Sequence, residues 1–78
     1  MKMKWIKTKT FPNIEGRFWL YGRVWGDKKP QLYILESLKI SNGFLYSAKG
    51  SYLWENEIEG VFYIMELFDP ELPDNETT

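Results

Sequence analysis

Residues 38–46 decide the fold of this 78-residue chain, and they read Leu38-Lys39-Ile40-Ser41-Asn42-Gly43-Phe44-Leu45-Tyr46. Asn and Gly both tolerate a positive φ, which a two-residue type I′ turn needs at both central positions. An Asn-Gly pair between two apolar runs is therefore a strong hairpin signal. We expect residues 31–41 and 44–49 to form antiparallel strands around a loop made of Asn42 and Gly43.

A two-residue loop also predicts which side chains face each other, because it fixes the register of the two strands. Glu36 then lies opposite Lys49, at the far end of the hairpin from the turn. One side of the hairpin is more apolar than the other, and we expect that side to face the core. It carries Leu32, Ile34, Leu38, Ile40 and Leu45.

Helix is the alternative for residues 32–40, which have leucines at a partly helical spacing. The segment lies between Pro30 and the Asn42-Gly43 pair, both of which interrupt helices. Its Tyr and Ile residues favour a strand. We therefore predict a strand here, and a helix would overturn the predicted fold.

Runs of β-branched and aromatic residues outside the hairpin indicate further strands, at residues 17–25, 52–54 and 61–68. The sequence predicts one mainly β domain over residues 1–73. We expect a small antiparallel sheet of four to five strands, curled or barrel-like in the manner of an SH3 domain. An open curved sheet that dimerises is the alternative. Residues 74–78 are predicted to be an acidic disordered tail.

The strand at residues 17–25 has two different faces, because alternate side chains of a strand point to opposite sides of its sheet. One side carries Phe18, Leu20 and Val24 and is an ordinary core face. The other side alternates arginine with large aromatic residues. We predict this stripe to be the partner-binding site, and it comprises Arg17, Trp19, Tyr21, Arg23 and Trp25.

Three interpretations of the stripe stay open. Trp, Tyr and Arg are enriched at the centres of protein interfaces, which favours a protein partner or a second copy of the chain. Aromatic rings beside guanidinium groups also bind bases and phosphates, although the net charge of −1 is unlike the basic surface of most nucleic-acid-binding domains. In the third interpretation, the N-terminal segment or the curl of the sheet covers the rings.

The composition excludes several kinds of chemistry. The chain has neither cysteine nor histidine, so it cannot form a Ser-His-Asp triad, a cysteine nucleophile or a usual zinc site. The alternating Glu55, Glu57 and Glu59 are interpreted as a solvated connector rather than calcium ligands. We expect no enzymatic activity, no catalytic residues, no metal and no cofactor.

The sequence also bears on location. The longest apolar run, residues 61–65, is far too short to span a membrane. The lysine-rich N-terminus is not followed by the apolar stretch of a secretion signal. The lack of cysteine fits a reducing compartment. We therefore expect a cytoplasmic protein that does not bind membranes.

Short motifs lie at both ends of the chain: Trp5-Ile6, Phe11-Pro12, Gly16, Gly60-Val61, Met65, Leu67 and Pro70. Together they resemble a family of short phage and prophage proteins, the domain of unknown function family 551. Its members open with Trp-Ile, Leu-Pro and a strand, and close with a Gly-Val segment rich in aromatic residues and proline. The chain departs from the family at four positions: Tyr63 and Ile64 stand where members tend to have His and Trp, and Glu66 and Phe68 replace two prolines.

The resemblance implies a phage or prophage accessory product that acts in the cytoplasm of a bacterial host. Together with the stripe, it leads us to expect a non-enzymatic protein that binds another macromolecule, such as an inhibitor of a host or defence protein. The expected partner is a protein or a second copy of the chain. A small nucleotide- or single-strand-binding module is the alternative, and a steep loss of affinity with salt would identify it.

Overall fold

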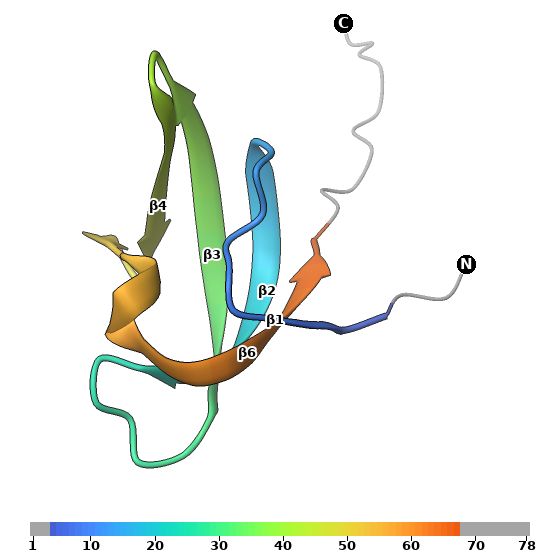
Figure 1. Ribbon diagram of the computed structural model, residues 1–78, viewed down its shortest axis with the longest axis vertical. Coiled ribbons are helices and arrows are strands. Elements are labelled where there is room, and N and C mark those ends of the chain that lie inside the picture. Colours follow the sequence, from blue (N-terminus) through green and yellow to red (C-terminus); the bar gives the residue numbers. More distant parts are fainter. Residues whose placement is uncertain (1–3, 68–78) are drawn as a thin grey trace, which may run out of the picture.

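The computed structural model describes residues 4–67, which form one antiparallel sheet of six strands (Figure 1). The strands are β1 (Ile6–Thr8), β2 (Gly16–Val24), β3 (Gln31–Ile40), β4 (Gly43–Ala48), β5 (Ser51–Tyr52) and β6 (Ile58–Glu66), with a 3₁₀ turn at Glu55–Glu57. Their order across the sheet is β1-β6-β2-β3-β4-β5.

The predicted fold class is confirmed, because the chain is mainly β and every strand pair is antiparallel. The sheet has six strands rather than four or five, and it is open, with β1 and β5 at its edges. Residues 32–40 lie within β3, so the helical alternative is excluded. The predicted domain boundary at residue 73 and the predicted tail at residues 74–78 lie outside the described residues.

The β3–β4 hairpin confirms the predicted pairing but not its turn. Ile40 pairs with Gly43, so the loop is Ser41-Asn42 rather than Asn42-Gly43. Gly43 itself begins β4 with a φ of +138°, which side chains rarely tolerate. Within residues 4–67, only Trp25 and Lys49 combine a side chain with a positive φ, so Asn42 does not. The turn is therefore not of type I′.

The shifted loop moves the register of the hairpin by two residues. Glu36 lies opposite Ser47, and the prediction that it faces Lys49 is wrong. Lys49 instead forms the next two-residue turn with Gly50, at φ values of +53° and +77°. Positive φ at both positions is the geometry of a type I′ turn. The chain thus makes this turn at Lys-Gly and not at Asn-Gly.

The core lies on the opposite face of β3 from the one predicted. Tyr33 and Leu35 are buried, whereas the predicted core residues Leu32, Ile34, Leu38 and Ile40 are exposed and Leu45 is half-buried. The cause is the pairing with β2, which places Leu35 opposite Phe18 and Tyr33 opposite Leu20. Directly opposed residues share a face of the sheet, so the core side of β2 decides which side of β3 is buried.

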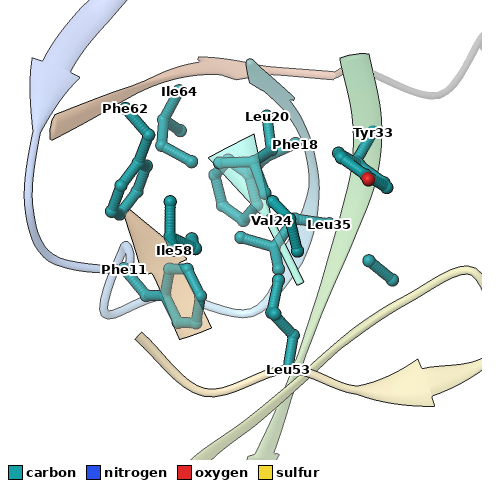
Figure 2. Packing of buried hydrophobic residues seen from close by; sticks show 11 residues of the cluster. Phe11, Phe18, Leu20, Val24, Tyr33, Leu35, Leu53, Ile58, Phe62 and Ile64 are labelled. Carbon is teal, nitrogen blue, oxygen red and sulfur yellow. The ribbon is translucent and has the colours of Figure 1, made fainter. Parts of the chain in front are cut away.

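The buried side chains gather inside the curl of the sheet, as Figure 2 shows for the larger ones: Phe11, Phe18, Leu20, Val24, Tyr33, Leu35, Leu53, Ile58, Phe62 and Ile64. Phe11, from the segment between β1 and β2, packs between β4 and β6, which are not neighbours in the sheet. The centroid of its ring lies 4.5 Å from that of Tyr46 on β4 and 5.7 Å from that of Phe62 on β6. The Tyr46 hydroxyl also donates to the carbonyl oxygen of Pro12 at 2.7 Å. This segment therefore closes the concave side.

A bulge bends β6 across the sheet, where its residues 60–62 stand opposite Gly22 of β2 alone. The bulge presses Phe62, which is 1% exposed, against the backbone of β2. A β-carbon at Gly22 would come within 2.8 Å of the β-carbon of Phe62. Only glycine allows the two strands to approach this closely.

We therefore expect Gly22→Ala to lower the free energy of unfolding by about 1–3 kcal/mol, because the added methyl group overpacks the core. Urea unfolding followed by tryptophan fluorescence measures the loss. Val61→Ala, at an exposed position of the same bulge, is the control and should change stability by less than about 0.5 kcal/mol. Equal effects of the two substitutions would contradict the close approach at Gly22.

Candidate functional site

The outer face of the sheet, the side turned away from the core, carries four of the five residues of the predicted stripe. Tyr21 is 42% exposed there, and Arg17, Trp19 and Arg23 are half-buried. They alternate along β2 with buried side chains, as the strand pattern predicts. The stripe is therefore on the surface and is not covered by core packing.

Trp25 does not continue the stripe. It follows the end of β2 and has a φ of +52°, in a turn closed by a 3.1 Å hydrogen bond from the Asp27 amide to the Val24 carbonyl oxygen. Its ring packs edge-on against Tyr33, with 6.0 Å between centroids. The positive φ interrupts the alternation of the strand, so this tryptophan belongs to the turn and not to the face of the sheet.

Neighbouring strands extend the stripe into an aromatic surface. Tyr21 lies opposite Leu32 on β3 and Tyr63 on β6. Trp5, just before β1, tilts its ring at 54° to that of Tyr21, with 6.3 Å between centroids. Trp5, Tyr21, Leu32 and Tyr63 line a shallow open groove of about 540 Å³, which we call the aromatic groove. The polar groups of its four lining side chains are the Trp5 indole N–H and the two tyrosine hydroxyls.

The surface beside the groove is also apolar. Trp19 lies between Ile34 on β3 and Met65 on β6. Ile34 is exposed, whereas Trp19 and Met65 are half-buried. An apolar band therefore runs across three strands next to the groove.

Charges at this end of the face are mainly positive. Lys7 lies opposite Tyr63, and Lys4 immediately precedes Trp5. Arg23 forms an ion pair of 2.6 Å with Glu59, and both side chains are substantially exposed. The Arg23 Nε also donates to the carbonyl oxygen of Asp27 at 3.1 Å. The lysines are thus the cations at the rim that have room to meet a ligand.

Sequence reasoning found Tyr21 but missed the other three residues of the groove. Leu32 was expected in the core, and the sequence pattern assigned no binding role to Trp5 or Tyr63. Leu32 is instead 53% exposed. The groove depends on pairing of β1 with β6 and of β6 with β2, which joins residues more than forty positions apart. Alternation along each strand could have identified Tyr63, because it has the opposite parity to Phe62 and Ile64.

No family model, curated protein or solved structure matches this chain. The resemblance to the domain of unknown function family 551 therefore stays a prediction. Within residues 4–67, no group of three or more acidic, histidine or cysteine side chains is placed to hold a metal ion. The same residues include no helix that is long and apolar enough to cross a membrane.

A second cluster of polar and aromatic side chains lies at the turn after β2. The Asp27 carboxylate accepts hydrogen bonds from the Tyr33 hydroxyl at 2.6 Å and from the Val24 amide at 3.1 Å. Lys49, in the turn between β4 and β5, places its ammonium group 5.1 Å from the centroid of the Tyr33 ring. These contacts hold two turns against one buried tyrosine. Stabilising these turns is enough to explain the cluster without a binding or catalytic role.

The hydrogen bond shifts the pKa of both partners. Donation to the Asp27 carboxylate, together with burial, raises the pKa of Tyr33 to about 12. The same bond, supported by the Val24 amide and the charges of Lys49 and Arg23, holds the pKa of Asp27 below its ordinary value despite partial burial. Each shift favours the protonation state in which the bond is intact.

These shifts predict how stability depends on pH. The contribution of Tyr33 is present below pH 10, its ordinary pKa, and is lost as pH rises through about 12. The contribution of Asp27 is present above its ordinary pKa of 3.8 and is lost as pH falls through the lower folded value. We expect Asp27→Asn to move the tyrosinate titration of Tyr33 towards pH 10, measured by ultraviolet absorbance.

Tyr33→Phe identifies which absorbance step belongs to Tyr33. Tyr52→Phe, at an exposed tyrosine, is the control and should leave that step in place. A titration of Tyr33 near pH 10 in the unmodified chain would contradict the hydrogen bond.

Proposed function

We propose that the chain is a non-enzymatic binding module that uses the aromatic groove to hold an apolar, acidic segment of a protein partner. The observation that carries this proposal is the position of the groove on the surface. Its four large side chains come from β2, β3, β6 and the residue before β1, and they lie together on the outer face of a small domain. Apolar patches of this kind in small domains mark interaction sites.

The residue types of the groove support a protein ligand. Trp and Tyr are the residues that most often contribute large shares of binding energy at interfaces. A groove lined mainly by apolar surface favours an aliphatic or aromatic side chain, which gains about 25 cal/mol for each Å² of apolar surface removed from water. The lysines at the rim, Lys4 and Lys7, favour carboxylates beside that anchor.

Single-stranded nucleic acid is the competing ligand, since aromatic rings and lysines can stack on bases and neutralise phosphates. Two observations favour protein. The chain has a net charge of −1, and the Arg23 guanidinium on the same face is already paired with Glu59. A basic, unpaired stripe would be the usual footprint of a nucleic-acid site.

The sequence resemblance extends the proposal to a biological setting. A phage or prophage accessory product of this kind would act in the cytoplasm of a bacterial host, by binding and inhibiting a host or defence protein. The groove would then be the part of the molecule that contacts the target.

Selection of random displayed peptides on the full chain tests the proposed ligand chemistry. We expect enrichment of peptides that combine a large apolar residue with Asp or Glu. Leu32→Lys should weaken their binding at least about tenfold, because it places an ammonium group in the apolar groove. Leu38→Lys is the matched control: it is on the same strand and face, at 57% exposure against 53% for Leu32. Binding should survive that change.

Oligothymidine is the second probe. Steep weakening of its binding with salt, together with loss in a Lys4→Ala, Lys7→Ala double variant, would replace the protein ligand with single-stranded nucleic acid. Peptides that bind Leu32→Lys and the unmodified chain equally would show that the groove is not the site.

A further inference from the structure

The β3–β4 hairpin carries a second apolar surface, separate from the aromatic groove. The last pair between β2 and β3 is Gly16 with Ser37, so the residues beyond it in β3 pair only with β4. The hairpin extends past the beginning of β2 in Figure 1. Its outer side, continued onto β5, forms what we call the hairpin ridge: Leu38, Ile40, Leu45 and Tyr52.

The ridge is strongly exposed. Leu38 and Tyr52 have 57% and 64% of their surface accessible, and Ile40 is exposed as well. Leu38 lies directly opposite Leu45 on the paired strand, which makes the apolar surface continuous across the hairpin. This surface contributes nothing to the core, because the buried residues of both strands lie on the other side.

Charge distinguishes the ridge from the groove. The four side chains of the ridge are uncharged, and residues 40–48, Ser51 and Tyr52 contain no charge. Of the charged neighbours of Leu38, Lys39 pairs with Phe44 on the other side of the hairpin, and Glu36 lies at the β2 end of the ridge. Lys49 of the intervening turn has its ammonium over the Tyr33 ring, on the core side. At the opposite edge, β1 contains Lys7, and Lys4 and Lys9 lie just before and just after it. Charged edges of this kind prevent strands from adding to a sheet, and the hairpin edge lacks that protection.

An uncharged patch is suited to contact with its own copy. In a two-fold interface each residue near the axis meets the same residue of the partner, so a charge there would be repelled by itself. The groove, with lysines at its rim, would suffer this repulsion. The ridge side chains carry no charge and would not be repelled, which favours a second copy of the chain as the occupant of the ridge.

The shape beside the ridge is also self-complementary. A hollow of about 340 Å³ adjoins it, with Leu38, Leu45 and Tyr52 on its walls together with Arg17 and Glu36. Exposed ridge side chains and a neighbouring hollow on one face allow the ridge of each copy to pack against the hollow of the other. Arg17 and Glu36 are opposed residues on β2 and β3, so the hollow has both signs of charge.

We propose that the hairpin ridge is a self-association surface through which two copies of this chain form a two-fold dimer. The ridge and the lining of the hollow together have eleven residues, about half the number on each side of a standard interface, which buries about 800 Å² on each partner. The dimer is therefore weak, with a Kd of roughly 100 µM. It leaves the aromatic groove of each copy accessible, so it does not depend on the function proposed for the groove.

Sedimentation velocity of the full chain, from about 10 µM to about 1 mM, tests the dimer. The unmodified chain should shift from monomer to dimer across this range. Leu38→Lys should raise the Kd at least about tenfold, since it places two ammonium groups against each other near the axis. Leu32→Lys, the matched change in the groove, should dimerise like the unmodified chain. Thermal unfolding of each variant confirms that the domain is intact.

Three results would overturn the proposal: a monomer at the highest concentration, a dimer unaffected by Leu38→Lys, or a dimer lost in Leu32→Lys. The last would assign self-association to the groove. The same two variants separate this proposal from the proposed function, because peptide binding should respond to Leu32→Lys and dimerisation to Leu38→Lys.

Cross-linking gives a positive test, and the chain has no cysteine of its own. A single Ser47→Cys, in the hollow, should form a disulfide dimer on oxidation at high concentration. Lys7→Cys, on the outer face of β1, should remain monomeric under the same conditions. Equal cross-linking of the two variants would show that the contacts are random collisions.

Discussion

The pairing of β2 with β3 is the constraint on which the rest of the structure depends. Phe18 lies opposite Leu35 and Leu20 lies opposite Tyr33, so the most apolar side of β2 selects its counterpart on β3. A sheet has two faces, and a domain ordinarily buries each apolar face against a further layer of helices or strands. Within residues 4–67 the chain has one sheet and one 3₁₀ turn. Only one face can therefore be covered from within.

Curling of the sheet makes this single layer sufficient for a core. Phe62 packs against Gly22 where β6 bulges, and Phe11 joins β4 to β6 across the concave side. The turn at Asp27 is held to Tyr33, and the turn at Lys49 lies over the same ring. These contacts replace the second layer of a larger domain, because each brings a distant strand or turn onto the same small cluster. The convex side receives no such cover.

The two sides of β3 show where sequence reasoning succeeds and where it fails. Alternation along β2 was enough to separate buried Phe18, Leu20 and Val24 from the outer stripe. In β3 both sides are apolar, so composition favoured Leu32 and Ile34, whereas the structure buries Tyr33 and Leu35. The choice is made by a partner strand about seventeen residues away in sequence, and no local pattern contains it. Local signals therefore predicted the elements better than their faces.

Turn chemistry failed for a related reason. Asn42-Gly43 and Lys49-Gly50 are both two-residue sequences ending in glycine, but only the second takes a positive φ at both positions. A shift of the first loop by one residue keeps Leu38 opposite Leu45. The predicted register would have placed Leu38 opposite Ser47. Cross-strand aliphatic pairs stabilise a hairpin, and this gain competes with the turn preference of Asn-Gly.

The unburied side of β3 connects the fold to the proposed functions. Leu32 and Leu38 are six residues apart on one strand and face, with nearly equal exposure, yet they belong to surfaces of different electrostatic character. Leu32 belongs to the groove that has Lys7 at its β1 side, whereas Leu38 lies among the uncharged side chains of the hairpin ridge. Apolar area supplies affinity without direction, whereas the charges around it decide which partner is tolerated. On the two proposals made above, the same strand presents one surface for an acidic partner and another for a second copy, and neither requires any change in the core.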